Sequence, residues 1–446
     1  MKSYERFAML MAVLSIIAST LMQPAQGTAA AQESVKGSAR TREATSGLRQ
    51  RTFEIVWRTI KEKHFDPNFN GVDWNKVHDV YAPRIAKVRS DKEFYEVLQE
   101  MLNELHQSHF VVIPPELTHK PETKDQQEAS VGLSLRIIDD EAVISRVLPD
   151  SPAARAGLKP GFVIKEIDGE TVEQIAAPLL KRKESPASLR ATLNGILEER
   201  QLGSPDTSLR LTVLGVGNEK RALTIKREML KGEMSPPVGG FPSFLMEFES
   251  KRLADGIGYV RFNMFLPVLN QRIRAAVRSM EDAPGIIIDL RGNPGGFDGV
   301  GQGLAGLFLD KQVSLGKSRS RQGYENYVVY PLKNPYAGPV VVLIDSMSGS
   351  ASESFSGGMQ SIGRAVVIGE RSGGGDLDAS IDTLPTGALL LYAYADFVTA
   401  KGESLEGRGV TPDIEAHLTR ASLLNGNDPQ LEAAINYIKK QSGQQK

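Results

Sequence analysis

The sequence of 446 residues contains no cysteine. Thiolate nucleophiles, thiolate zinc sites and disulfide bridges are therefore excluded together. A lipid anchor attached to an N-terminal cysteine is excluded as well. The absence suits a protein that is exported and folds without relying on oxidation.

The chain also has almost no net charge. The chain has 53 Lys and Arg residues against 54 Asp and Glu residues, which leaves a formal charge of −1 at pH 7. No strong field exists to attract nucleic acid or an acidic membrane surface, so neither is an expected partner. A hydrophobic share of 41% and a charged share of 24% are ordinary for a soluble globular protein. The length indicates roughly two or three domains.

Long apolar runs are missing except at the N-terminus. Lys2 and Arg6 stand at the start of a nearly apolar run over 7–21, and small residues over 25–31 offer signal-peptidase sites. The run falls short of the ~20 residues that span a membrane. We therefore predict a signal peptide over 1–31, no stable membrane insertion after its cleavage, and a periplasmic or extracellular protein.

Composition and periodicity divide the rest of the chain. Residues 32–47 are polar and aperiodic, which predicts a flexible leader. Apolar residues recur at helical spacing over 48–115, which predicts an N-terminal helical domain. From 128 to 230 short strands alternate with glycine turns around a charged helical insert. Pro114-Pro115 and a polar linker separate these two units.

From 240 to 420 the pattern alternates between β-rich runs and helices. Such alternation predicts an α/β domain in which helices pack on a largely parallel sheet. A C-terminal helix and polar tail are expected over 428–446. The expected strands are 257–262, 285–290, 340–344 and 365–368, and the expected helices are 268–280, 299–308 and 352–362.

A glycine-rich turn follows the second of these strands directly. It reads Asp-Leu-Arg-Gly-Asn-Pro-Gly-Gly over 289–296. Glycines let backbone amides point into a cleft because no Cβ blocks them. The turn lacks the Gly-Lys-Ser/Thr of a P-loop. A tight structural turn or another phosphate cradle remains the alternative to a catalytic role.

A serine-rich segment follows the third strand. It reads Ser-Gly-Ser-Ala-Ser-Glu over 348–353. A serine on a strand-to-helix turn exposes its hydroxyl, and the amides of the helix N-terminus can stabilise an oxyanion. The alternative is a cluster of helix-capping serines, with Ser352 and Glu353 in that role.

These segments together resemble the carboxy-terminal-processing, or tail-specific, serine peptidases, a family related to the tricorn core protease. The Val-Ile-Gly-Glu strand end over 367–370 and the Gly-Arg-Gly-Val-Thr-Pro-Asp run over 407–413 follow in the family's order. The stretch 151–161 resembles a bacterial PDZ domain. The resemblance covers residues 48–420 and implies a crotonase/ClpP-like catalytic core with no metal or cofactor. It places the nucleophile at Ser350 and the oxyanion amides at Gly295, Gly296 and Ala351.

A further absence separates this chain from many members of the family. Their general base is a lysine, and its position falls at Gly375 in this sequence. No lysine occurs between Lys333 and Lys401. Arg371 cannot replace it, because an arginine with a pKa above about 12 does not give up its proton. A Ser-Lys dyad is not expected.

The tricorn-like branch of the family uses histidine as the base, and the chain resembles it here. Ser108-His109, at the end of the helical domain, resembles the Ser-His pair of that branch. A neutral imidazole can accept the serine proton. The resemblance implies a tetrad of Ser350, His109, Ser108 and Glu406. A structural histidine, or a metal site with His106, is the alternative, although no third metal ligand is evident.

PDZ domains add a peptide strand to a sheet edge and hold its terminal carboxylate on backbone amides. The candidate binding segment contains Gly132, Leu133 and Ser134, with a purely structural strand as the alternative. We therefore expect a serine endopeptidase that cuts protein or peptide substrates near their C-termini through an acyl-enzyme at Ser350. The other hypotheses are a catalytically silent peptide- or ligand-binding protein on this fold, and a hydrolase of short peptides with the PDZ-like domain as a lid or regulator.

Overall fold

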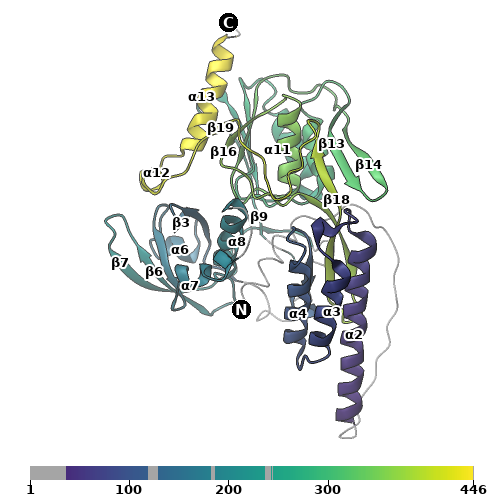
Figure 1. Ribbon diagram of the computed structural model, residues 1–446. Coiled ribbons are helices and arrows are strands. Elements are labelled where there is room, and N and C mark those ends of the chain that lie inside the picture. Colours follow the sequence, from purple (N-terminus) through teal and green to yellow (C-terminus); the bar gives the residue numbers. More distant parts are fainter. Residues whose placement is uncertain (1–36, 119–128, 182–185, 237–242, 244, 445–446) are drawn as a thin grey trace.

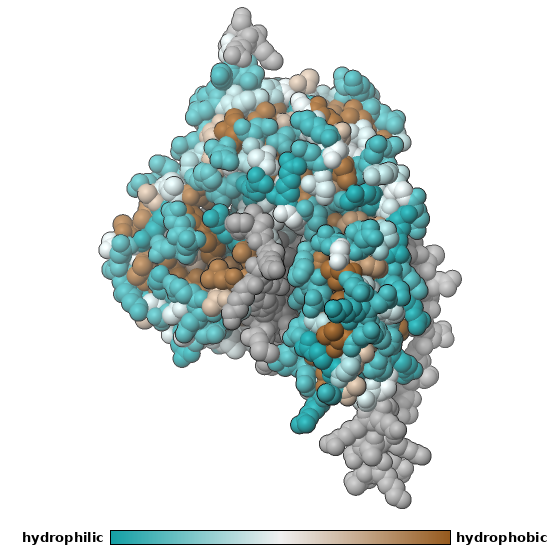
Figure 2. Space-filling model, in the orientation of Figure 1, coloured by the Kyte–Doolittle hydropathy of each residue, from teal (hydrophilic) through white to brown (hydrophobic). Residues whose placement is uncertain are grey.

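The computed structural model describes residues 37–118, 129–181, 186–236, 243 and 245–444, so the predicted signal peptide lies outside it. Figure 1 shows the N-terminal helices and the PDZ-like domain below the α/β core, with the C-terminal helix on the opposite side. Polar residues cover most of the face in Figure 2, and apolar side chains gather on the lobe formed by the PDZ-like domain. None of the described helices is both long and apolar enough to cross a membrane.

The N-terminal domain is built from helices α2 (Gly37–Lys63), α3 (Trp74–Ile85) and α4 (Asp91–Asn103). Helix α4 begins where the Ser90 side chain accepts a hydrogen bond from the Glu93 N–H. Its apolar face, with Phe94 and Leu98 fully buried, packs into the domain core. The prediction of a flexible leader is wrong for residues 37–47, because α2 already begins at Gly37. Extending a formed helix by further turns needs no new nucleation, so a polar segment can continue it.

The helical domain contacts the core through a strand that pairs with one of the core sheets. Strand β1 (Val111–Ile113) pairs antiparallel with β18 (Leu389–Thr399), with Val112 opposite Leu390. Val112 and Leu390 belong to the same apolar cluster as the helices. The segment that carries Ser108 and His109 is therefore held between α4 and a strand of the core. A short helix, α5 (Pro115–Thr118), follows β1.

The PDZ-like domain has the strands and the helical insert that the sequence predicts. Its sheet has the order β2-β3-β4-β6-β7, with β5 beside β4 and β2 at one edge. Ser151 caps helix α6 by accepting from the Ala154 N–H, and Pro152 occupies the first turn. The elements are β2 (Leu133–Ile138), β3 (Glu141–Val147), α6 (Pro152–Arg155), β4 (Val163–Ile167), β5 (Glu170–Thr171), α7 (Val172–Ala176), α8 (Pro186–Glu199), β6 (Ser208–Leu214) and β7 (Lys220–Lys226).

The core is a layered α/β domain, as predicted. Its sheet has the order β10-β11-β12-β15-β16-β19, parallel from β11 onward. Alternate residues of a strand face opposite sides. Ile288 and Val342 join the cluster of helices α9–α11, whereas Ile287 and Val341 join that of α13. The elements are β10 (Phe248–Arg252), β11 (Gly258–Phe262), α9 (Asn270–Arg278), β12 (Ile286–Asp289), α10 (Asp298–Ala305), β15 (Val340–Ile344), α11 (Ala351–Ser361), β16 (Val366–Gly369), β19 (Ile414–Glu415), α12 (Arg420–Leu424) and α13 (Pro429–Gln444).

A second core sheet was not predicted. It has the order β1-β18-β13-β14, with β17 beside β18. Helix α11 lies between this sheet and the parallel one, because Phe355 and Met359 of α11 share a cluster with Leu315 of β13 and Phe397 of β18. Its remaining strands are β13 (Val313–Ser320), β14 (Gly323–Val329) and β17 (Leu377–Thr383), and a separate pair is formed by β8 (Glu233–Met234) and β9 (Leu245–Met246).

Candidate active site

Ser350 lies on the turn between strand β15 and helix α11. Its backbone adopts φ 48° and ψ −123°, a conformation that non-glycine residues rarely occupy and that marks functional turns. The side chain is 5% exposed. The Ser350 N–H donates to the Gly375 carbonyl at 2.9 Å. The predicted strand-to-helix turn is confirmed.

The glycine-rich turn packs directly against this serine. Gly295 has φ 114°, and a Cβ at this position would lie 2.7 Å from the Ser350 Cβ and 3.0 Å from the Ala351 nitrogen. The Gly295 N–H already donates to Asn293 Oδ1 at 3.0 Å. No described residue accepts a hydrogen bond from the N–H of Gly296 or Ala351. The structure thus brings the three predicted oxyanion residues together, and the N–H groups of Gly296 and Ala351 have no acceptor among the residues that the structure describes.

Ser108, His109 and Glu406 form a hydrogen-bonded relay. Ser108 Oγ lies 2.6 Å from His109 Nδ1 and donates to Glu406 Oε2 at 2.8 Å. The Ser108 N–H donates to Glu406 Oε1 at 2.7 Å, and the Asp376 N–H donates to Oε2 at 3.1 Å. Residues separated by 298 positions in the sequence are thereby joined.

Gly375 lies between the relay and Ser350. Its carbonyl accepts the Ser350 N–H, and a Cβ on it would lie 3.5 Å from the Ser108 Cβ. His109 is 5% exposed, and its Nε2 makes no hydrogen bond within the part of the chain that the structure describes. The position where the family carries lysine is therefore adjacent both to the serine turn and to the histidine relay.

Burial determines the charge states of the relay. It lowers the pKa of the His109 imidazole to about 3, so the ring is neutral at neutral pH. Burial raises the pKa of Glu406 to about 7, against the opposite effect of its hydrogen bonds from Ser108 and Asp376. Glu406 therefore changes its charge near neutral pH while His109 does not.

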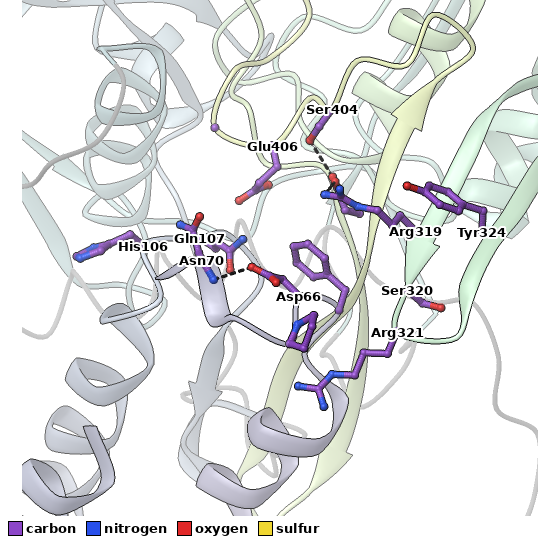
Figure 3. Close-up of a pocket in the computed structure, with 14 residues that line it drawn as sticks. Asp66, Asn70, His106, Gln107, Arg319, Ser320, Arg321, Tyr324, Ser404 and Glu406 are labelled. Atoms are coloured by element: carbon purple, nitrogen blue, oxygen red, sulfur yellow. Dashed lines mark hydrogen bonds and ion pairs between the residues drawn. The ribbon is translucent and has the colours of Figure 1, made fainter. Parts of the chain in front are cut away.

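A cavity of about 780 Å³ opens behind the relay, between the helical domain and the second sheet. Figure 3 shows Glu406 and Gln107 on its wall, facing Asp66 and Arg319. The cavity gives solvent a route to the Glu406 end of the relay. Among the described residues, no group of three His, Asp or Glu side chains is arranged to hold a metal ion.

Strand β2 is an edge strand, as peptide addition requires, but its outward amides are already used. The Leu133 N–H donates to Gln201 Oε1 at 3.2 Å, and the Leu135 N–H donates to Glu198 Oε1 at 3.1 Å. Ser134 pairs with Arg146 of β3. Gly132 packs against Ser151, since a Cβ on it would lie 2.5 Å from the Ser151 Cβ. The predicted peptide-binding segment is thus covered by side chains of its own domain.

Asp345 connects the PDZ-like domain to the glycine-rich turn, and sequence reasoning missed it. Its Oδ2 accepts from Arg136 Nε of β2 at 2.7 Å, and its Oδ1 accepts from the Gly292 N–H at 2.9 Å. Met347 beside it is buried in the PDZ-like core. The signal in the sequence was an aspartate that directly follows an all-apolar strand and precedes the serine segment.

Three family profiles match the chain. Residues 256–416 match Peptidase family S41, residues 49–103 match the Tricorn protease C1 domain, and residues 122–186 match the PDZ domain. The S41 match covers the glycine-rich turn, Ser350 and Glu406. The C1 match lies within the N-terminal helices and ends shortly before Ser108.

Known proteins resemble the chain over most of its length. It is 27% identical over 391 residues to a carboxyl-terminal-processing protease of Synechocystis sp., covering 86% of this chain and 85% of the relative. It is 27% identical over 415 residues to a tricorn protease homolog of Streptomyces coelicolor, of which it spans 32%. The fold is similar to that of the photosystem II D1 C-terminal processing protease, with a TM-score of 0.57, 22% identity, and coverage of 83% of this chain and 93% of that one. The chain is therefore similar to peptidase family S41 over 256–416, to the tricorn C1 domain over 49–103 and to the PDZ domain over 122–186, and its similar proteins include carboxyl-terminal-processing proteases and a tricorn protease homolog.

Proposed function

We propose that the protein is a serine endopeptidase in which Ser350 is the nucleophile and His109 is the general base. The observation that carries the proposal is the relay from Glu406 through Ser108 to His109, which ends at a buried Nε2 without a hydrogen bond to any described residue. Export to the periplasm or the cell exterior, predicted from residues 1–31, is part of the proposal.

The relay determines which nitrogen of His109 carries the proton. A serine hydroxyl has one proton, and Ser108 donates it to the Glu406 carboxylate. Ser108 Oγ can therefore only accept from His109, so the proton of the ring lies on Nδ1 and the lone pair on Nε2. A base of this form can take the proton of Ser350 as its Oγ attacks a peptide carbonyl. The same proton then passes to the leaving amine, and water hydrolyses the acyl-enzyme.

The oxyanion of that reaction needs donors that are already in place. The amides of Gly296 and Ala351 have no acceptor among the described residues and flank the Ser350 turn. We assign the oxyanion hole to these two amides, with the N-terminus of α11 adding its dipole. Gly295 contributes by lacking a side chain, because its own N–H is used by Asn293.

Fluorophosphonate labelling tests the proposal. We expect the purified protein to be labelled, Ser350→Ala not to be labelled, and His109→Ala to be labelled at least about 10³-fold more slowly, as loss of a triad base implies. The measurement is the rate of probe incorporation. His78→Ala is the control, because His78 pairs with Glu54 within the helical domain. Absence of labelling in the unmodified protein would favour a silent binding protein, and a wild-type rate in His109→Ala would remove the base assignment.

We further propose that the PDZ domain binds the C-terminal tails of substrates, which add a strand to the edge of β2. The name of the carboxyl-terminal-processing relatives is consistent with this choice of substrate segment. A peptide strand would have to displace Glu198 and Gln201 from the amides of Leu135 and Leu133. Arg136 and Asp345 would transmit this change to the glycine-rich turn. Tail binding and access to the active site would then be coupled.

Removing the two covering side chains should tighten peptide binding. Each hydrogen bond that a peptide has to displace is worth about 0.5–1.5 kcal/mol, so Glu198→Ala with Gln201→Ala is expected to raise affinity about tenfold. The measurement is fluorescence anisotropy of a labelled peptide on Ser350→Ala protein, which cannot cleave it. Glu173→Ala is the control, because Glu173 is exposed and lies on helix α7 of the same domain. Unchanged affinity would argue against strand addition at β2.

A further inference from the structure

Glu353, three residues after the nucleophile, has its carboxylate fully buried. Four donors surround it. Oε1 accepts from Ser372 Oγ and, at 2.8 Å, from the Gly374 N–H. Oε2 accepts from the Gly375 N–H at 2.9 Å and from the Ser350 N–H at 3.2 Å. Both oxygens thus accept hydrogen bonds from backbone or hydroxyl donors, one of them in the adjacent serine turn and three in the segment Ser372–Gly375.

Helix capping explains only one of these bonds. A glutamate in the first turn of a helix commonly accepts the N–H of the capping residue, and here that residue is Ser350. The other three donors come from Ser372, Gly374 and Gly375, which lie 19 to 22 positions further along the chain. A residue that only capped α11 would not need them.

The segment Ser372–Gly375 separates the nucleophile from the relay. On one side, the Gly375 carbonyl accepts the Ser350 N–H. On the other side, Gly375 packs against Ser108, and the Gly374 carbonyl accepts the N–H of Gly407, next to Glu406. A shift of this segment would therefore change the spacing between Ser350 and the Ser108–His109 pair.

We infer that Glu353 is a positioning residue: it binds the segment Ser372–Gly375 to the serine turn and so holds the histidine relay in register with Ser350. The inference rests on the proposed function. A carboxylate suits this role because it only accepts hydrogen bonds, and all four neighbours donate. A glutamine of the same shape would turn an NH2 group toward two donors and release part of the segment.

The test compares Glu353→Gln, Ser372→Ala and the control Glu370→Gln. Glu370 is a partly buried carboxylate at the end of β16 that accepts from the Leu418 N–H and from Gln430. Displacing catalytic groups by about 1 Å can cost about 100-fold in rate. We expect Glu353→Gln to lose about 100-fold in fluorophosphonate labelling rate and in kcat for a fluorogenic peptide, with KM within about twofold. Ser372→Ala, which removes one of the four donors, should lose roughly tenfold, and Glu370→Gln should behave as the unmodified protein.

Thermal unfolding of each variant separates positioning from structural support. If Glu353→Gln is folded and is labelled at the wild-type rate, the inference is overturned, even if the Tm of the variant is lowered. If Glu353→Gln does not fold, Ser372→Ala decides, and a wild-type rate in that variant overturns the inference. An unmodified protein that is not labelled contradicts the proposed function and this inference with it. Normal labelling of both the unmodified protein and Glu353→Gln contradicts this inference alone.

Discussion

Replacing Glu406 by glutamine is expected to lower kcat by about 10³–10⁴-fold while leaving KM nearly unchanged, since exchanging the carboxylate of a serine-protease triad for an amide lowers kcat about 10⁴-fold by changing the tautomer of the histidine. The NH2 group of the glutamine meets a backbone donor in either orientation, the Ser108 N–H at the Oε1 position or the Asp376 N–H at the Oε2 position. At the Oε2 position it also gives a proton to Ser108 Oγ, which formerly donated one. The Ser108 hydroxyl then turns its proton toward His109 Nδ1. The single proton of the neutral ring then lies on Nε2, so this nitrogen has no lone pair to accept the proton of Ser350.

The pH dependence gives this variant a second readout. Burial raises the pKa of Glu406 to about 7, and it lowers the pKa of His109 to about 3. A protonated Glu406 donates to Ser108 as the glutamine does, so activity should be low at pH 6 and rise as the pH increases through about 7. Burial also raises the pKa of Glu353 to about 7, so the residual activity of Glu406→Gln should keep only the part of this rise that Glu353 contributes. An unchanged rise in the variant would assign the whole titration to a group other than Glu406.

Glu403→Gln is the matched control for Glu406→Gln. Glu403 is exposed and pairs with Arg408 at 3.2 Å, three positions before Glu406. The control should keep the kcat, the KM and the pH profile of the unmodified protein. A loss of activity in Glu403→Gln with normal activity in Glu406→Gln would reverse the assignment of the relay carboxylate.

The glycine-rich turn and the serine turn were predictable because they depend on local sequence. The strands that precede Gly295 and Ser350 are short, apolar runs, and neighbouring parallel strands end at the same edge of a sheet. The two turns therefore had to meet, and the structure brings Gly295 into contact with Ser350. Their glycines and serines alone predict a candidate oxyanion turn and a candidate nucleophile.

The second sheet was not predictable in the same way. Strand β18 is buried along most of its length, so its residues do not alternate between apolar and polar. Without that alternation a strand cannot be distinguished from a buried helix by periodicity. Strand β1 was not predicted because it is only three residues long. It also follows the helices of the N-terminal domain in the sequence, whereas in the structure it pairs with β18 of the core.

The connections of the site depend on contacts between distant residues. From the sequence, Glu353 is interpreted only as a helix-capping residue, because nothing there indicates that Ser372, Gly374 and Gly375 contact it. The relay of Ser108 and Glu406 was inferred from resemblance, and only the fold provides the contact itself. The part of the site that the sequence could not predict is therefore the set of contacts that aligns its groups.

Replacing Gly295 by alanine is expected to reduce fluorophosphonate labelling about 10³-fold, because it displaces the nucleophile and the oxyanion amides together. The new Cβ would lie 2.7 Å from the Ser350 Cβ and 2.8 Å from the Gly349 carbonyl oxygen. Neither group is the end of a flexible side chain, so the turn itself has to move. The positive φ of 114° adds strain for any residue with a Cβ, at a cost of about 1–3 kcal/mol.

Gly299→Ala, four positions along the same segment, provides the control and should have the opposite effect on stability. Gly299 lies in helix α10, and a Cβ there would meet no atom within 4 Å. Alanine in a helix is favoured over glycine by about 0.5–1 kcal/mol, so this variant should unfold at a slightly higher temperature and label normally. Labelling and thermal unfolding of both variants are the measurements. Equal labelling of the two would mean that the oxyanion amides do not depend on contact between Gly295 and Ser350, and the assignment of Gly296 and Ala351 would lose its structural basis.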